Sequence, residues 1–309
     1  MGAGENNRLL RYGKAGIVVD MTDETTIEVL RYSAFTTDPA GGNPAGVVLD
    51  ASTLDDDGML AIAADVGFSE TAFITARDDA ERRFRLRYFS PLAEVAFCGH
   101  ATIATAVAMA ERIGPGELLF DTRAGEIPVM TRRDDSGVLY ATLTSVATRS
   151  RPAQDEELDA TLDALGWSRT DLDAQLPPHV SFGGNEHLVL AAAARARLAD
   201  LDYDFDALAK VMQQRGWTTV QLVWRESPDR FHARDPFPIG GVVEDPATGA
   251  AAAAFGGYLL ALGLVSQPTT ITIRQGEDMG RPGELLVGID PSDPRVQVTG
   301  AAVPHAVEL

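Results

Sequence analysis

The sequence has few cysteines and few basic residues, and both shortages exclude classes of protein. Its 309 residues include a single cysteine, Cys98, so an intramolecular disulfide is impossible and a cytoplasmic protein is expected. Lysine and arginine together number 26 against 45 aspartates and glutamates, which gives a net charge of −19. Phosphate recognition depends on a basic face, so we expect no nucleic-acid partner. The acidic residues are scattered along the chain and indicate a solvated surface.

Membrane, metal and nucleotide signals are equally scarce. Residues 249–265 carry no charge, but they are mostly alanine and glycine and too few for a typical membrane span. We therefore expect a helix buried in a folded lobe and no membrane association. The other histidines lack metal-ligand spacing, and a lone His100 does not make a metal site, so we predict no metal. Residues 41–43 and 183–185, both Gly-Gly-Asn, match no nucleotide-binding loop, and no cofactor is expected.

What is present indicates a large folded chain with mixed secondary structure. Hydrophobic residues make up 45% of the sequence, enough for one large domain or for two of about 150 residues. Residues 1–25 show no clear period and are interpreted as an extension. Beyond them, alternating or apolar runs predict strands, and longer periodic or alanine-rich runs predict helices. Strands are expected at 27–32, 71–74, 84–89, 117–120, 127–130 and 139–143, and helices at 54–66 and 101–112.

An internal repeat organises these elements. A shift of the chain on itself by 147 residues matches Arg83 with Arg230, Phe84 with Phe231, Arg87 with Arg234 and Pro91 with Pro238. The same shift places Cys98 on Asp245, just before a small-residue helix in each half. We therefore predict two lobes of like design. The amino-terminal lobe comprises residues 26–149, joined by about 296–309, and the carboxy-terminal lobe comprises residues 150–295.

In both halves a reactive side chain precedes the start of a helix rich in small residues. Helix amino termini leave several N–H groups unpaired and carry partial positive charge, so they can bind a carboxylate or stabilise a developing enolate. Gly99, Ala101, Gly249 and Ala250 would let a ligand approach the backbone closely. The alternative is that these residues serve only tight helix packing.

Four side chains are candidates for acid and base chemistry. Glu70 stands between two phenylalanines where an apolar strand begins, and partial desolvation there suits a general acid and base, although a strand-edge or capping glutamate is the alternative. Cys98 precedes a helix and is either a thiolate base or nucleophile or a small buried residue. His100 would donate to a substrate carboxylate or to a backbone carbonyl. Asp245 would act in the site, cap the second helix, or do both.

Six ordered segments resemble the signature segments of the phenazine-biosynthesis isomerase-like family. They are 42–47 (GNPAGV), 69–73 (SETAF), 89–94 (FSPLAE), 98–102 (CGHAT), 244–249 (EDPATG) and 275–282 (QGEDMGRP). The resemblance spans about residues 27–303 and implies the α+β fold of diaminopimelate epimerase. That fold has two similar lobes, each a curved, mostly antiparallel sheet or barrel around a central helix, with the active site between them.

The resemblance also implies roles for individual residues. Glu70 matches the family's acid/base glutamate, and His100 and Asp245 match polar groups of its catalytic pocket. Asn43 takes the place of a substrate-orienting asparagine. The predicted substrate-binding residues are completed by Cys98, Gly99, Ala101, Thr248, Gly249 and Ala250. Epimerases of this fold use two cysteines, and a chain with one cysteine cannot perform two-thiol racemisation.

The sequence therefore predicts a cofactor-independent isomerase that moves a proton on a small carboxylated amino or hydroxy acid, such as a dihydro-hydroxyanthranilate. Ala250 stands where the family often has serine, so the substrate could differ from the phenazine intermediate. The alternatives are a one-base epimerase or lyase using the same pocket, and a binding protein of this fold without turnover. The resemblance further implies a homodimer.

Overall fold

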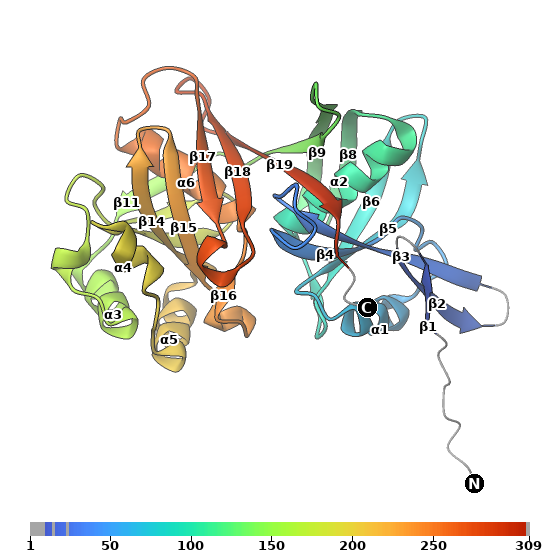
Figure 1. Ribbon diagram of the computed structural model, residues 1–309, viewed down its shortest axis with the longest axis horizontal. Helices are drawn as coiled ribbons and strands as arrows, with labels where there is room; N and C mark the ends of the chain where they lie inside the picture. The colour runs from blue at the N-terminus through green and yellow to red at the C-terminus, as the bar shows by residue number, and fades with distance from the viewer. Residues whose placement is uncertain (1–9, 14–15, 23–24, 307–309) are drawn as a thin grey trace, which may run out of the picture. The chain divides into compact units, whose positions relative to one another are not determined.

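The chain folds into two units that are similar in design (Figure 1). A computed structural model describes residues 10–13, 16–22 and 25–306. The first unit comprises residues 1–40, 44–141 and 301–309, and the second comprises residues 41–43 and 142–300. Besides the short segment 41–43, the chain passes from one unit to the other within strands β10 (Leu139–Thr144) and β19 (Val296–Pro304).

The first unit wraps a mostly antiparallel sheet around one helix. Its strands are β1 (Leu10–Gly13), β2 (Gly16–Thr22), β3 (Thr25–Ala34), β4 (Asn43–Val48), β5 (Thr71–Asp78), β6 (Arg83–Phe89), β7 (Glu94–Val95), β8 (Gly116–Thr122) and β9 (Gly125–Arg133), and its helices are α1 (Asp56–Val66) and α2 (Gly99–Ile113). Strand β4 pairs parallel to β5, β5 antiparallel to β6, β6 parallel to β8, and β8 antiparallel to β9. Helix α2 packs against β3, β5 and β9.

Helix α2 is buried on all sides, which explains its composition. Every residue from His100 to Ala110 is buried, so the helix has no polar face and consists largely of alanine and threonine. The threonine hydroxyls are satisfied locally: Thr105 Oγ1 donates to the Ala101 carbonyl at 2.7 Å, and Thr102 Oγ1 donates to that of Cys98 at 2.6 Å. Small side chains let the curved sheet close around the helix.

The second unit repeats this arrangement and adds an outer helical layer. Its strands are β11 (Arg149–Pro152), β12 (His179–Phe182), β13 (Glu186–Ala191), β14 (Thr219–Ser227), β15 (Arg230–Pro236), β16 (Glu244–Asp245), β17 (Thr269–Gln275) and β18 (Gly283–Ile289), its α-helices are α3 (Asp155–Leu165), α4 (Arg195–Ala199), α5 (Phe205–Arg215) and α6 (Gly249–Ala261), and its short 3-10 turns are η1 (Arg169–Asp171), η2 (Pro238–Gly240) and η3 (Glu277–Met279). Strand β13 pairs parallel to β14, β14 antiparallel to β15, β15 parallel to β17, and β17 antiparallel to β18. The order and directions match those of the first unit. The predicted fold class is therefore confirmed.

Helix α6 is the counterpart of α2. It packs against β11, β12, β13 and β18, and its residues from Ala251 to Leu259 are buried. The uncharged stretch of the sequence is thus the interior helix of the second unit. Among the residues that the structure describes, no helix combines the length and the apolar character that crossing a bilayer requires.

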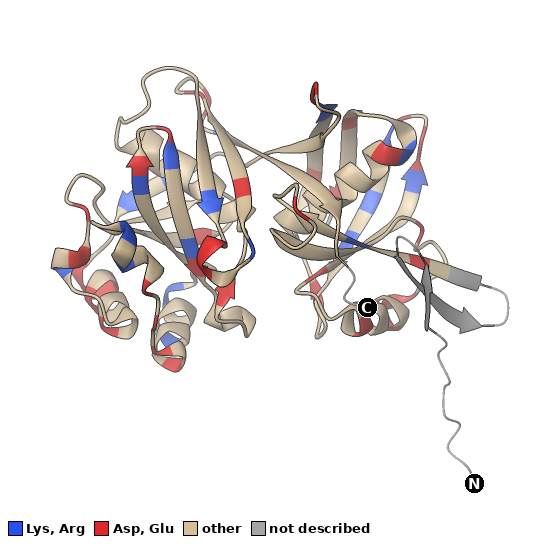
Figure 2. Cartoon of the chain, viewed as in Figure 1, with Lys and Arg blue, Asp and Glu red and all other residues tan. Residues whose placement is uncertain are grey.

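Two parts of the fold add detail to the sequence interpretation. The segment interpreted as an extension contains β1 and β2, which pair antiparallel with each other, and β2 also pairs antiparallel with β3. Helices α3 and α5 pack on each other and on the outer face of the second sheet, around Trp217 and Leu222. Figure 2 shows charged positions along these two helices, and all of those on α3 are acidic, as expected of a solvated layer on a chain with a large negative charge.

Candidate active site

Glu70, Cys98 and His100 meet in the first unit. Cys98 Sγ lies 3.5 Å from Glu70 Oε2 and 3.3 Å from His100 Nδ1. His100 Nε2 lies 3.4 Å from Glu70 Oε2 and 3.4 Å from Ser69 Oγ. The side chains of His100 and Glu70 are 9% and 18% exposed. A titratable cluster that is largely withdrawn from solvent, but still reachable, is typical of an acid and base site.

The sheet fixes where Glu70 stands. It directly precedes β5, and its carbonyl accepts a hydrogen bond of 3.1 Å from the Gly46 N–H on the neighbouring strand. A Cβ atom at Gly46 would lie 2.4 Å from Thr71 Oγ1, so only glycine permits this approach. Glycine at position 46 therefore helps to hold Glu70 at the sheet edge.

Cys98 and His100 are positioned by the start of α2. Cys98 is the N-cap residue, but its side chain makes no capping hydrogen bond. The first helical N–H to bond within the helix is that of Thr102, which donates to the Cys98 carbonyl at 3.1 Å. The N–H groups of Gly99, His100 and Ala101 precede it and have no partner within the helix. They give this end of α2 the character of an anion-binding site beside Glu70.

Asp245 and Asn43 meet in the second unit. Asn43 Nδ2 donates to Asp245 Oδ1 at 2.8 Å and to the Ala247 carbonyl at 3.0 Å. Thr248 Oγ1 donates to the other oxygen of Asp245 at 2.6 Å. The N-cap residue of α6 is Thr248, so Asp245 does not occupy the capping position that the sequence left open for it. Its carboxylate is instead held in one orientation by two donors.

Gln275 organises the same turn and was not predicted as a site residue. Its Nε2 donates to the Asp245 carbonyl at 2.8 Å, and its Oε1 accepts from the Thr248 N–H at 3.0 Å. The N–H of Thr248, a predicted substrate-binding residue, is therefore already engaged. The sequence feature that could have pointed to Gln275 is the glycine that follows it. Gly276 has φ of +81°, and a Cβ there would lie 2.2 Å from the Arg281 carbonyl oxygen, so the turn requires glycine.

The strand registers give a residue-by-residue correspondence between the units. Arg87 on β6 pairs with Phe73, and Arg234 on β15 pairs with Leu222. Three residues before these two partners stand Glu70 and Thr219, respectively. The parallel pairs β4–β5 and β13–β14 then align the two Gly-Gly-Asn segments, so that Asn43 corresponds to Asn185.

The predicted equivalence of Cys98 with Asp245 is wrong. Glu94 pairs with the last residue of β6, and Glu244 with the last residue of β15. Four residues after each glutamate stand the helix N-caps, Cys98 and Thr248. An ungapped shift fails because residues 237–243 separate β15 from β16, whereas only residues 90–93 separate β6 from β7. Asp245 thus has no polar counterpart in the first unit, and Ala250 stands in the place of His100.

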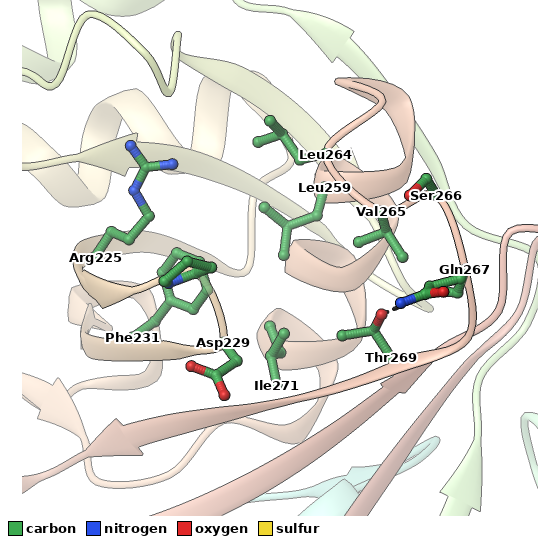
Figure 3. A pocket seen from close by; sticks show the side chains of 11 residues that line it. Arg225, Asp229, Phe231, Leu259, Leu264, Val265, Ser266, Gln267, Thr269 and Ile271 are labelled. Carbon is green, nitrogen blue, oxygen red and sulfur yellow. Dashed lines mark hydrogen bonds between the residues drawn. The ribbon is translucent and has the colours of Figure 1, made fainter.

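A separate pocket lies in the second unit, with an apolar floor and a polar rim (Figure 3). Phe231, Leu259 and Ile271 form much of the lining, and Arg225 and Asp229 lie at its edge. Leu259 is near the carboxyl end of α6, so the pocket is remote from the helix start that follows Asp245. It contains none of the predicted site residues.

Comparison with known proteins places these groups in a family context. The family model described as phenazine biosynthesis-like protein matches residues 32–307. The uncharacterized isomerase YfhB of Bacillus subtilis is 32% identical over 285 residues, which cover 89% of this chain and 96% of that protein. The trans-2,3-dihydro-3-hydroxyanthranilate isomerase of Pseudomonas chlororaphis is 30% identical over 274 residues, or 87% of this chain and 94% of that protein.

A solved structure agrees with these relatives. The phenazine biosynthesis protein of Bacillus anthracis, of the PhzF family, superposes with a TM-score of 0.81 at 26% identity and covers 92% of this chain and all of that one. The family match, the named isomerases and the shared architecture point the same way. The chain belongs to the family of phenazine biosynthesis-like proteins, and it is an isomerase.

Proposed function

We propose that the protein is a cofactor-independent isomerase in which Glu70 moves a proton within a small carboxylated metabolite. The asymmetry of the repeat supports this most directly, because Glu70 occupies one of two corresponding positions and Thr219 the other. A threonine hydroxyl is not an acid or base near neutral pH, so of the two corresponding positions only Glu70 can take and return the proton. Two-base racemisation would need a second such group.

The proposed step is a proton shift without oxidation or reduction. Glu70 removes a proton from an activated C–H bond, and the electron pair of that bond enters an adjacent unsaturated system. Glu70 then returns the proton to a different carbon. The N–H groups at the start of α2 would stabilise the negative charge that develops between these two events. His100, 3.4 Å from Glu70 Oε2, would hold the carboxyl or a substrate oxygen by a hydrogen bond.

We further propose that Asp245 binds an amino or hydroxyl group of the substrate. Its orientation by Asn43 and Thr248 supports this role, because a carboxylate that is already fixed loses little freedom when a ligand binds. The N–H groups of Gly249 and Ala250 would contact the substrate carboxylate. Ala250 cannot supply the hydroxyl that relatives often have there, which favours a substrate with one polar substituent fewer. We propose a homodimer in the cytoplasm as the working form.

The test is to incubate the protein in heavy water with trans-2,3-dihydro-3-hydroxyanthranilate and with a panel of small amino and hydroxy acids. We expect an isomerised product that carries deuterium at the newly protonated carbon, and activity that does not fall after treatment with a chelator. Deuterium at the original carbon with loss of configuration would instead support the one-base epimerase. Loss of a substituent would support the lyase, and tight binding of a panel member without turnover would support a binding protein.

A further inference from the structure

The Glu70, Cys98 and His100 cluster has the dimensions of a metal-binding site. Each side chain offers one ligand atom, and these atoms all lie within 4.8 Å of one another. Cys98 Sγ lies 3.5 Å from Glu70 Oε2 and 3.7 Å from His100 Nε2, and the nitrogen lies 3.4 Å from the carboxylate oxygen. Ordinary zinc bond lengths in a tetrahedral arrangement require about 3.5 Å from sulfur to nitrogen or oxygen, and about 3.3 Å from nitrogen to oxygen. The three distances between the ligand atoms therefore fit coordination of one ion.

The chemistry of the ligands selects the kind of ion. A thiolate and an imidazole favour Zn²⁺ and similar borderline-soft cations, whereas Mg²⁺ and Ca²⁺ prefer oxygen ligands. Three protein ligands leave a fourth position for water, as in zinc sites that stay open on one side. The cluster is largely withdrawn from solvent, which strengthens the attraction between a cation and its carboxylate and thiolate ligands.

We propose that Glu70, Cys98 and His100 form a reversible binding site for Zn²⁺, and that the bound ion switches the isomerase off. The inhibitory half rests on the proposed function, because the ion takes the carboxylate oxygen that would carry the proton. Binding also requires the loss of the Cys98 thiol proton, so affinity rises with pH. One ion per chain is expected. The corresponding positions of the second unit carry Thr219, Thr248 and Ala250, which offer no comparable ligand set.

The experiment uses the full chain, freed of metal with a chelator, and titrates it with Co²⁺ as a spectroscopic substitute for Zn²⁺. We expect one equivalent to bind with a sulfur-to-cobalt charge-transfer band, and Zn²⁺ to displace it. Cys98→Ala and Cys98→Ser should both lose the band. Glu70→Gln and His100→Gln should weaken Zn²⁺ binding at least about tenfold. His232→Gln is the matched control: it removes another histidine that contacts two carboxylates, Glu277 and Glu226, and should bind as the wild type does.

The outcomes separate this inference from the proposed function. Absence of the charge-transfer band, binding that survives both cysteine variants, or binding lost only in His232→Gln would each overturn the metal site without touching the isomerase. With a substrate in hand, Zn²⁺ should suppress turnover in proportion to occupancy, and a chelator should restore it. Activity that appears only when the metal is added would overturn the inhibitory role and the cofactor-independent mechanism together.

Discussion

The two units share a backbone plan but use the corresponding positions differently. In the first unit, Glu70 lies among Cys98 and His100, with part of its side chain exposed to solvent. In the second, Thr219 is fully engaged: its hydroxyl donates to Asp235 Oδ1 at 2.8 Å and lies 2.8 Å from His187 Nδ1. All three of these side chains are buried. The repeat thus conserves the scaffold, while at these corresponding positions the first copy leaves titratable groups partly accessible and the second copy buries them.

The largest difference between the copies should be in turnover. Glu70→Gln keeps the size and hydrogen-bonding shape of the side chain but cannot exchange a proton. We expect kcat to fall at least ~100-fold with ligand binding largely retained. Thr219→Ser, its counterpart in the second unit, keeps the hydroxyl and should leave kcat unchanged. Steady-state kinetics and substrate titration measure both effects.

Cys98→Ala sharpens the same test, since the thiol is the other candidate base. We expect Cys98→Ala to lower kcat far less than Glu70→Gln does. If Cys98→Ala were inactive while Glu70→Gln kept nearly full activity, the thiol would be the base and the assignment to a glutamate-driven isomerase would be wrong.

Each unit has an arginine–glutamate ion pair shortly before its central helix, and loss of the two pairs should lower the free energy of unfolding by different amounts. Arg234 and Glu244 have side chains 10% and 3% exposed, whereas those of Arg87 and Glu94 are 21% and 11% exposed. Glu244→Ala leaves a buried guanidinium without its carboxylate and should cost about 3–5 kcal/mol. Glu94→Ala should cost only ~1 kcal/mol, because Arg87 keeps its exposed partner Asp56. Denaturant unfolding of both variants measures the contrast, and equal losses would contradict it.

The two Gly-Gly-Asn segments allow a third comparison. Asn43 is 1% exposed and donates to both Asp245 and Ala247, whereas Asn185 is exposed. Asn43→Ala should lower the free energy of unfolding by roughly 1–3 kcal/mol, because buried acceptors lose their hydrogen-bond donor. It should also raise KM, because Asp245 is no longer held in one orientation. Asn185→Ala should stay within about 0.5 kcal/mol. A KM that moves only in Asn185→Ala would show that the orientation of Asp245 does not matter for binding.

Local patterns predicted most helices and strands, because the spacing of apolar residues within a segment indicates which of the two it forms. The strand expected at 84–89 is β6 (Arg83–Phe89), and the helix expected at 101–112 is α2 (Gly99–Ile113). The repeat located the second helix start, but it could not show a three-residue difference in a loop, since loop length leaves no periodic trace. That difference moved the counterpart of Cys98 from Asp245 to Thr248.

Long-range contacts were the least predictable part. The sequence supplied Gln275 as part of a motif, but its bonds to Asp245 and Thr248 cross 30 and 27 residues, respectively. The group of His187, Thr219 and Asp235 has no sequence signature at all, because it forms only when β13, β14 and β15 lie side by side. Strand pairing, rather than spacing, brings such groups together.

The last predicted effect concerns this buried group and its dependence on pH. Burial lowers the pKa of His187 from 6.5 to about 3. Between these values the unfolded chain binds a proton that the folded chain does not, so stability is lost as the pH falls. For Asp235, burial raises the pKa well above 3.8, with Asp245 and Glu244 adding to the shift. Above pH 3.8 the folded chain retains a proton that the unfolded chain releases, so stability is lost as the pH rises.

Between pH 3.8 and 6.5 the two contributions therefore oppose each other. Asp235→Asn keeps a neutral side chain of the same shape and removes one of them, so this variant should lose stability relative to the wild type as the pH falls, by at most about 1.4 kcal/mol per pH unit. His187→Gln keeps a donor toward Thr219 and removes the other, so it should lose relative stability as the pH rises. Denaturant unfolding at several pH values in this window measures both slopes. Slopes of the same sign, or no slope in either variant, would contradict the assignment of a neutral His187 and a protonated Asp235 to the folded chain.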